Sequence, residues 1–307
     1  MSTPQRSGMS RRHFIQTAAA FSGLALGAHA AEPIVRNGKP HMKLSLAAYS
    51  FNRVLAKRPE TAEPGRMDMH AFIDFCAEQD LDGTELTSYY FPAKVDTAYL
   101  NSLAHRAFEL GLDVSGTAIG NDFCLAPGEA RDADLAMTRE WIDYAAILGA
   151  PVIRIFAGKV SAGDTEEVAL ERCVEGINES LKYAAEKGVY LALENHGGIT
   201  ARPEQLLNIV KAVEPSPWFG INFDSGNFQT EDPYAALEMI APYAVNAQIK
   251  VSIKPNGKKE RSDFSRVIGI LRDANYRGYV VLEYEEPEDP FENIPPLLRE
   301  LRELISL

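Results

Sequence analysis

Short apolar runs alternate with longer stretches of helical periodicity along this chain, from Lys43 to its end. The runs have the length and the near-continuous apolar character of strands that are buried on both faces of a parallel sheet. They cover residues 43–51, 82–90, 113–120, 151–158, 189–196, 219–226, 246–253 and 279–286. The pattern therefore predicts eight strands, each followed by a helix.

The stretches between these runs predict the connecting helices. Several of them end on a glycine, as helices do where a buried strand follows. Eight strand–helix repeats favour a closed (β/α)8 TIM barrel over an open doubly wound sheet, and no turn carries the G-x-G-x-x-G motif of such a sheet. No Ser/Gly-rich linker interrupts the alternation. We therefore predict one barrel domain over residues 43–307, closed by a helix over residues 295–307.

The first thirty residues predict an export signal. Arg11 and Arg12 form the pair of a twin-arginine signal, residues 17–28 are weakly apolar, and Ala28-His29-Ala30 is a small-x-small cleavage site. We expect cleavage after Ala30, residues 31–42 as an N-terminal segment, and a periplasmic or exported protein. A short anchoring helix is the alternative, but the stretch is shorter than the roughly twenty residues of a membrane span. We expect no stable membrane association.

The charge balance and the cysteines exclude several classes of partner and site. The chain carries a formal charge of −12, and loss of the signal's three arginines lowers it to −15. A domain with this negative charge repels nucleic acid and anionic membranes. Cys76, Cys124 and Cys173 are odd in number and form no C-x-x-C pair. This argues against a disulfide framework and against a thiolate metal site.

Polar residues end four successive apolar runs in the second half of the chain: Glu194, Asp224, Gln248 and Glu283. The steps between them have the size of a strand–helix repeat, so parallel strands would bring them to one rim of the barrel. Three crowded carboxylates need a compensating cation or shared protons. An all-oxygen set favours Mn²⁺ or Mg²⁺ over Zn²⁺. The alternative for each residue is a strand-end group bonded to a neighbouring loop.

Other polar side chains are expected to line the same rim. Because side chains alternate along a strand, His196 shares a face with Glu194, and Lys250 shares one with Gln248. We expect substrate contacts from His196, Lys250, Arg154, Asn222, Asn227 and Glu85. Arg154 and Lys250 would polarise a carbonyl or hold hydroxyls. The alternative is that both pair with the rim carboxylates.

A basic loop follows the seventh run, over residues 254–261. It leads to Ser262, which we expect to cap the next helix. A basic loop at a helix N-terminus on this rim would suit an anionic group of the substrate. The alternative is a solvated loop with no ligand.

Several motifs together resemble the sugar phosphate isomerase/epimerase superfamily with the xylose isomerase-like TIM barrel, over roughly residues 43 to 300. They are L-E-N-H-G-G, F-D-S-G-N, L-E-Y-E, and a pattern similar to H-x-K with Gln248 in the place of the histidine. The resemblance implies a divalent metal held by Glu194, Asp224, Gln248 and Glu283. It also implies that the two glutamates move protons. Gln248 departs from the histidine of ketose 3-epimerases, and Asn227 stands where they have a substrate-binding histidine.

These observations predict a divalent-metal-dependent sugar isomerase or epimerase that acts on a ketose or keto-sugar. Metal chelation would acidify the C–H beside the carbonyl and hold the enediolate, with Glu194 and Glu283 as the acid/base pair. A lyase or hydratase that eliminates a β leaving group is the first alternative, and a non-catalytic exported sugar-binding protein is the second. The acidic body argues against a DNA-repair nuclease. A small sugar is the expected partner, and the resemblance also implies a possible homo-oligomer.

Overall fold

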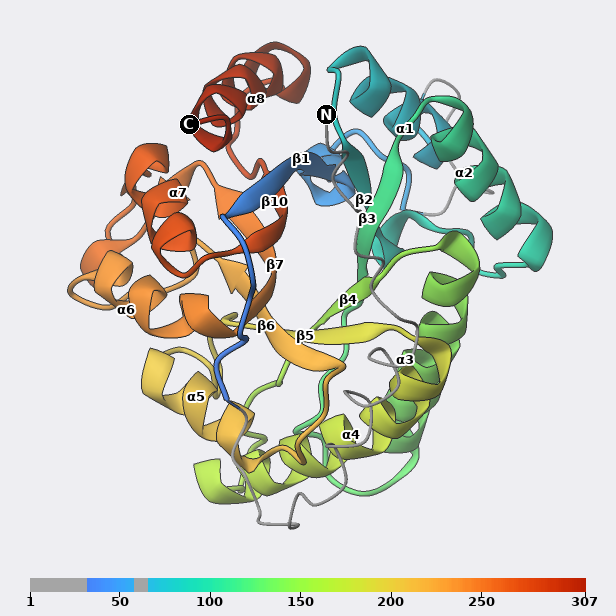
Figure 1. The fold of residues 1–307 in the computed structure, drawn as a ribbon. Helices are drawn as coiled ribbons and strands as arrows, with labels where there is room; N and C mark the ends of the chain where they lie inside the picture. Colours follow the sequence, from blue (N-terminus) through green and yellow to red (C-terminus); the bar gives the residue numbers. More distant parts are fainter. Residues whose placement is uncertain (1–31, 58–65) are drawn as a thin grey trace, which may run out of the picture.

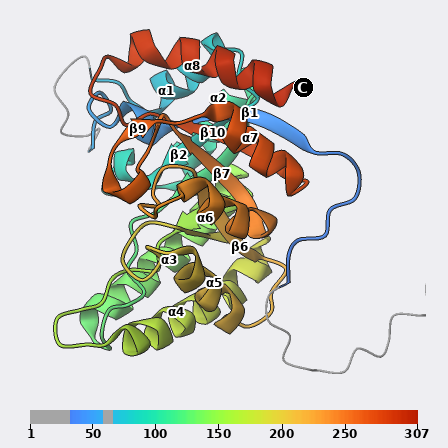
Figure 2. The same cartoon turned by 90° about the vertical axis from the view of Figure 1, so that its left-hand side faces the viewer.

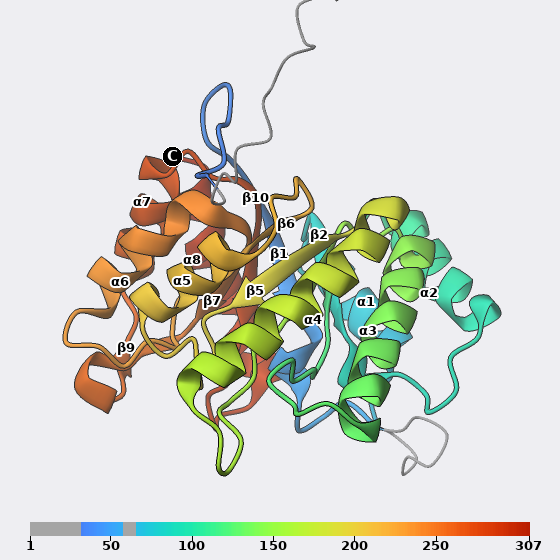
Figure 3. The ribbon, with the colours of Figure 1, turned by 90° about the horizontal axis from the view of Figure 1, so that it is seen from below.

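The computed structural model describes residues 32–57 and 66–307. The export signal predicted over residues 1–30 lies outside the described residues. The stretch 32–40 runs across one end of the molecule, where the Ile34 amide donates a 3.0 Å hydrogen bond to the Pro242 carbonyl. Figures 2 and 3 both place this stretch at one end of the barrel and strand β9 at the opposite end.

Eight parallel strands close into a barrel in the order β1-β10-β7-β6-β5-β4-β3-β2 (Figure 1). The predicted TIM barrel is therefore confirmed. The barrel strands are β1 (His41–Ala47), β2 (Gly83–Thr87), β3 (Asp113–Ala118), β4 (Val152–Ile155), β5 (Tyr190–Glu194), β6 (Phe219–Asp224), β7 (Ala244–Lys250) and β10 (Arg277–Glu283). Each of the eight predicted runs overlaps one of these strands, and β1, β7 and β10 begin two residues before their runs.

Helices form a ring outside the barrel (Figure 1). They are α1 (Met69–Glu78), α2 (Thr97–Glu109), α3 (Glu129–Leu148), α4 (Glu166–Lys187), α5 (Pro203–Ala212), α6 (Pro233–Ile240), α7 (Phe264–Asp273) and α8 (Pro290–Ile305). Helices α3 and α4 end at Gly149 and Gly188, both with φ 72°, a left-handed conformation that favours glycine. The chain then turns directly into β4 and β5, which fixes where those strands begin.

The strands are shorter at their carboxyl ends than the apolar runs predicted. The run 43–51 divides into β1 and the 3-10 helix η2 (Ala48–Phe51), and the run 82–90 divides into β2 and η4 (Ser88–Tyr90). Buried residues continue past the last strand pairing, so hydrophobicity alone does not mark the strand end. Strand β1 begins at His41, two residues before the predicted domain start, because it pairs with β10 from Arg277 onward.

Two helix starts also differ from the prediction. Helix α8 begins at Pro290, with the Asp289 carboxylate accepting from the Phe291 amide, rather than at Pro295. Helix α7 is capped by Asp263, whose Oδ1 accepts from the Arg266 amide, so Ser262 is not its N-cap. In both cases an aspartate accepts the amide of the first turn, and aspartate is among the strongest N-caps.

Cys76, Cys124 and Cys173 are buried and free. Within residues 32–57 and 66–307, no helix has both the length and the apolar character needed to cross a membrane.

Candidate active site

The four predicted strand-end residues do meet at one rim of the barrel. Glu194, Asp224 and Glu283 are the last residues of β5, β6 and β10, and Gln248 lies two residues before the end of β7. Strand register places Asp224 beside Gln248 and Glu283 beside Lys250. All four predicted residues are at least 96% buried. The four residues therefore share one rim, and the contacts of their side chains determine what it can bind.

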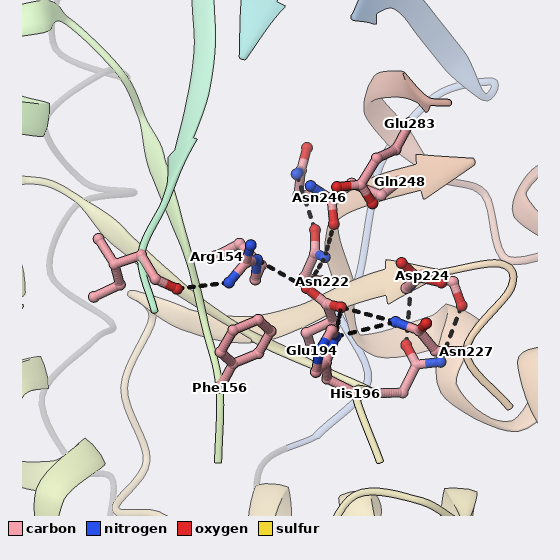
Figure 4. Close-up of polar contacts among 12 residues, drawn as sticks. Arg154, Phe156, Glu194, His196, Asn222, Asp224, Asn227, Asn246, Gln248 and Glu283 are labelled. Atoms are coloured by element: carbon pink, nitrogen blue, oxygen red, sulfur yellow. Dashed lines mark hydrogen bonds and ion pairs between the residues drawn. The ribbon is translucent and has the colours of Figure 1, made fainter. Parts of the chain in front are cut away.

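Glu194 is held by an ion pair with Arg154 and by hydrogen bonds with neighbouring side chains, among them a 3.4 Å bond from Asn222 Nδ2 to its Oε2 (Figure 4). Its Oε2 lies 2.8 Å from Arg154 Nε, and its Oε1 lies 2.6 Å from His196 Nδ1 and 2.8 Å from Asn227 Nδ2. Burial acts to raise the pKa of Glu194, but Arg154 and His196 outweigh it and lower the pKa. The same contact, against the effect of burial, raises the pKa of His196. Glu194 is therefore an ionised carboxylate at neutral pH.

Arg154 is fixed from several sides. Its Nη1 donates a 2.6 Å hydrogen bond to the Ile119 carbonyl, and its guanidinium lies 4.0 Å from the centre of the Phe156 ring. The Phe156 ring in turn lies 4.1 Å from the His196 ring, centre to centre. Arg154 thus takes the ion-pairing alternative of the two roles expected for it. The arrangement holds the Glu194 carboxylate in one orientation.

Lys250 lies among the other carboxylates of the rim. Its Nζ is 2.7 Å from Glu283 Oε2 and 2.8 Å from Glu285 Oε1. It is also 3.5 Å from Asp224 Oδ2, a buried atom with no hydrogen-bond partner in the described part of the chain. Burial acts to lower the pKa of Lys250, but these carboxylates outweigh it and raise the pKa. The ammonium is therefore charged at neutral pH.

Asp224 and Glu283 are both easier to protonate than an ordinary carboxylate. Burial raises the pKa of Asp224 to about 8, with Lys250 opposing the shift and Glu194 adding to it. Burial likewise raises the pKa of Glu283, again against the effect of Lys250. The rim therefore holds Glu194 and Glu283 with pKa values shifted in opposite directions, which is how acid and base roles are separated within one site.

Four amide and carboxyl side chains form a buried network beside the rim. Gln248 donates from Nε2 to Glu85 Oε1 at 2.6 Å and accepts at Oε1 from Asn222 Nδ2 at 2.7 Å. Asn246 Nδ2 donates to Glu85 Oε2 at 3.1 Å and to Asn222 Oδ1 at 2.9 Å. Burial raises the pKa of Glu85 to about 7, and the nearby charge of Glu283 adds to the shift. Both the Oε1 and the Nε2 of Gln248 are thus hydrogen-bonded to other protein side chains.

The raised pKa values of Glu85 and Asp224 predict that the folded state loses stability as pH rises. Between their ordinary pKa values, 4.5 and 3.8, and the folded values near 7 and 8, the folded state binds more protons than the unfolded state. Stability therefore falls with rising pH across this window. For Glu85 the loss is on the order of 3 kcal/mol.

Urea unfolding of the wild type and Glu85→Gln between pH 5 and 8.5 measures this loss. We expect the wild type to lose stability relative to the variant as pH rises. A constant difference between the two proteins across this range would show that Glu85 titrates normally.

The described residues do not assemble a metal site. No group of three His, Cys, Asp or Glu side chains in residues 32–57 and 66–307 is arranged to hold a metal ion. Carboxylate and amide oxygens are the donors that Mg²⁺ and Mn²⁺ prefer. Here, however, Arg154 pairs with Glu194, Asn222 binds the Gln248 oxygen, and Lys250 pairs with Glu283. The donor types fit a divalent cation, but their arrangement does not fit the expected common ion.

The basic loop is largely neutralised by its neighbours. It folds as a small hairpin of β8 (Ser252–Ile253) and β9 (Glu260–Arg261) around the 3-10 helix η6 (Pro255–Gly257). Lys259 pairs with Glu286, and Arg261 pairs with Glu300 at 2.9 Å. These pairs favour the alternative without a ligand over an anion site.

Two residues outside the predicted set belong to the site. Glu285 binds Lys250, and Phe156 packs against both Arg154 and His196. Strand alternation was the available signal in both cases, because Glu285 follows Glu283 by two residues and Phe156 follows Arg154 by two.

Two hollows open at this rim. One, of about 290 Å³, is lined by Phe156 and His196, and the other, of about 260 Å³, by Lys250, Asn227 and Glu285. A larger hollow of about 810 Å³ lies at the opposite end of the barrel, beside Arg36 and Arg277. The catalytic end of a TIM barrel is the carboxyl rim, so the two smaller hollows are the candidate substrate sites.

Comparison with known proteins identifies the type of barrel. A family model described as "Xylose isomerase-like TIM barrel" matches residues 73–304. No curated protein matches the chain significantly.

Solved structures of similar fold include a 3-keto-D-glucoside 4-epimerase from E. coli, with 18% identity and a TM-score of 0.65 over 85% of this chain and 99% of the other. A D-psicose 3-epimerase from Clostridium cellulolyticum has 16% identity and a TM-score of 0.67 over 86% and 97%. A probable 3-DHS dehydratase from Bacillus anthracis has 15% identity and a TM-score of 0.60 over 87% and 99%. Likeness at these identities establishes the fold.

Proposed function

This chain belongs to the xylose isomerase-like TIM barrel family, and from that premise we propose that it is a sugar-modifying enzyme that epimerises or isomerises a ketose or keto-sugar. The reaction moves a proton on the carbon beside a carbonyl group. The observation that carries the proposal is the pair of buried rim glutamates, Glu194 and Glu283, whose pKa values are shifted in opposite directions.

The two glutamates divide the proton transfer between them. Glu194 is ionised and rigidly oriented, so it is the base that takes the proton from carbon. Glu283 has the raised pKa and stands on a different strand, so it is the acid that returns a proton to the carbon. If the two act on opposite faces of the substrate, the configuration at that carbon inverts. If the proton returns to the neighbouring carbon, the product is an isomer.

The other rim residues hold the substrate and the two glutamates in place. His196 and Asn227 bind Glu194 and also border the two rim hollows. They are therefore placed to exchange part of their contact with Glu194 for sugar hydroxyls. The Mn²⁺ or Mg²⁺ expected from the sequence takes no part in these steps, because protein donors already engage Glu194, Gln248 and Glu283.

Product analysis tests this proposal and its main alternative together. The purified protein is incubated with free ketoses and with keto-glycosides, and the products are identified by NMR. An epimer or an isomer is the expected result. An unsaturated product would assign the same carbanion chemistry to a lyase. A folded protein that binds a sugar but converts none of them would contradict the enzyme and favour a sugar-binding protein.

A further inference from the structure

We propose that the ammonium group of Lys250 takes the place of a divalent metal ion in this barrel and is the electrophile that binds the substrate carbonyl oxygen. This inference rests on the proposed function and assigns the part of the reaction that stabilises negative charge on oxygen. Two observations support it: the contacts of Lys250, and the protein partners that already occupy the residues expected to hold a metal.

Lys250 already binds the carboxylate that a metal would need. Its Nζ lies 2.7 Å from Glu283 Oε2, and Mg²⁺ would bind such an oxygen at about 2.0–2.1 Å. Both cations would then share one buried carboxylate, where like charges repel strongly because the local dielectric is low. The Lys250 side chain is 7% exposed, so it cannot withdraw into solvent without rearrangement.

The backbone also makes room for this lysine. A Cβ atom at Gly226 would lie 2.6 Å from Lys250 Cβ and 2.5 Å from the Ser252 carbonyl oxygen. Real Cβ atoms do not approach other atoms so closely. The glycine at this position therefore lets the Lys250 side chain pass beside β6 to reach the carboxylates.

Two buried cations already lie among the buried carboxyl groups of the rim. Four buried carboxyl groups, Glu85, Glu194, Asp224 and Glu283, are accompanied by two buried cations, Arg154 and Lys250. The two cations bring the same formal charge as one divalent ion. The neutral amide of Gln248 is turned toward Glu85 through its Nε2 and adds no charge.

Lys250 retains capacity for a substrate oxygen. Two of its donor directions are taken by Glu283 and Glu285, and the third faces Asp224 Oδ2 at 3.5 Å. That oxygen has no hydrogen-bond partner among the described residues. A sugar oxygen could take the place of this long Asp224 contact and accept a hydrogen bond from the Lys250 ammonium. The hollow of about 260 Å³ at Lys250 provides the approach.

The step balances without an oxidant or reductant. Glu194 takes the proton from the carbon beside the carbonyl, and the C–H electron pair becomes a C=C bond. The carbonyl π electrons move to oxygen, where the Lys250 ammonium holds the charge. The protonated form of Glu283 then gives its proton to carbon, where the C=C electron pair forms the new C–H bond and the carbonyl re-forms. Exchange with solvent removes the proton from Glu194 and returns one to Glu283.

Manganese binding tests the substitution without reference to activity. The full-length protein, Lys250→Met, Lys250→Arg and the exposed-site control Lys258→Met are titrated with Mn²⁺ by calorimetry and by EPR of free Mn²⁺, after thermal melts confirm folding. We expect no stoichiometric binding to wild type, Lys250→Arg or Lys258→Met. Lys250→Met should bind one Mn²⁺, because it leaves the rim carboxylates without their cation. Tight binding of one Mn²⁺ by the wild type would overturn the inference.

Activity measurements separate the failure of this inference from failure of the proposed function. Chelator-treated wild type should keep its full rate, and Lys250→Met should lose about 10²–10³-fold, the loss typical of a removed oxyanion donor. A rate that disappears on chelation and returns with Mn²⁺ would overturn the role of Lys250 while leaving the sugar epimerase or isomerase intact. Absence of turnover in both the metal-free and the Mn²⁺-treated protein would overturn the proposed function.

Discussion

Glu194→Gln is expected to slow exchange of the substrate's C–H hydrogen with solvent by about 10²–10⁴-fold, the usual contribution of a positioned general base. Glutamine keeps the size of the side chain but cannot accept a proton at neutral pH. The side-chain amide can still accept from Arg154 or from His196 and Asn227, so the fold should persist. NMR of the substrate in D₂O measures the exchange rate directly.

Glu283→Gln supplies the matched comparison. If Glu283 is the acid on the second face, this variant should still exchange the substrate hydrogen through Glu194 but form little epimer or isomer. Equal loss of exchange in both variants would contradict the division of roles. Unchanged exchange in Glu194→Gln would remove Glu194 from the chemistry.

Arg154→Met is expected to lower the free energy of unfolding by about 3–5 kcal/mol, the range measured when one partner of a buried ion pair is removed. Glu194 would then keep only His196 and the amide donors in a site that is almost closed to water. The stack of the guanidinium on Phe156 and the bond to the Ile119 carbonyl would also be lost. Urea unfolding at pH 8, where Glu194 must carry its charge, measures the change.

The double variant Arg154→Met/Glu194→Gln separates the charge from the packing. Because it leaves no uncompensated carboxylate, it should recover a large part of the stability lost in Arg154→Met. If Arg154→Met costs less than about 1 kcal/mol, the value typical of an exposed pair, the buried ion pair does not organise the site.

The barrel and its catalytic rim could be predicted because both follow from local patterns. Continuous apolar runs between helices predict buried parallel strands, and the ends of such strands meet at one rim. Glu194, Asp224 and Glu283 lie within two or three residues of the ends of their runs, which is enough to place them at this rim. The pairing of His196 with Glu194 follows from alternation along a strand, since the two residues are separated by one.

The partners of these carboxylates could not be predicted in the same way. Whether Arg154 and Lys250 contact a substrate or the rim carboxylates depends on side-chain directions across several strands. The orientation of Gln248 depends on Glu85, 163 positions away. The sequence therefore left both roles open for Arg154 and Lys250. The predicted metal site assumed that no protein cation pairs with the rim carboxylates. The ion pair of Lys250 with Glu283 contradicts that assumption.

Deuterium incorporation into a keto-sugar substrate tests the central claim most directly, which is that this rim abstracts a proton beside a carbonyl. The recovered sugar from D₂O is analysed by NMR after incubation with wild type, with Glu194→Gln and without protein. We predict loss of the signal of one C–H group beside the carbonyl with the wild type only. Retention of that signal with the wild type, in a sugar that binds, would contradict the account.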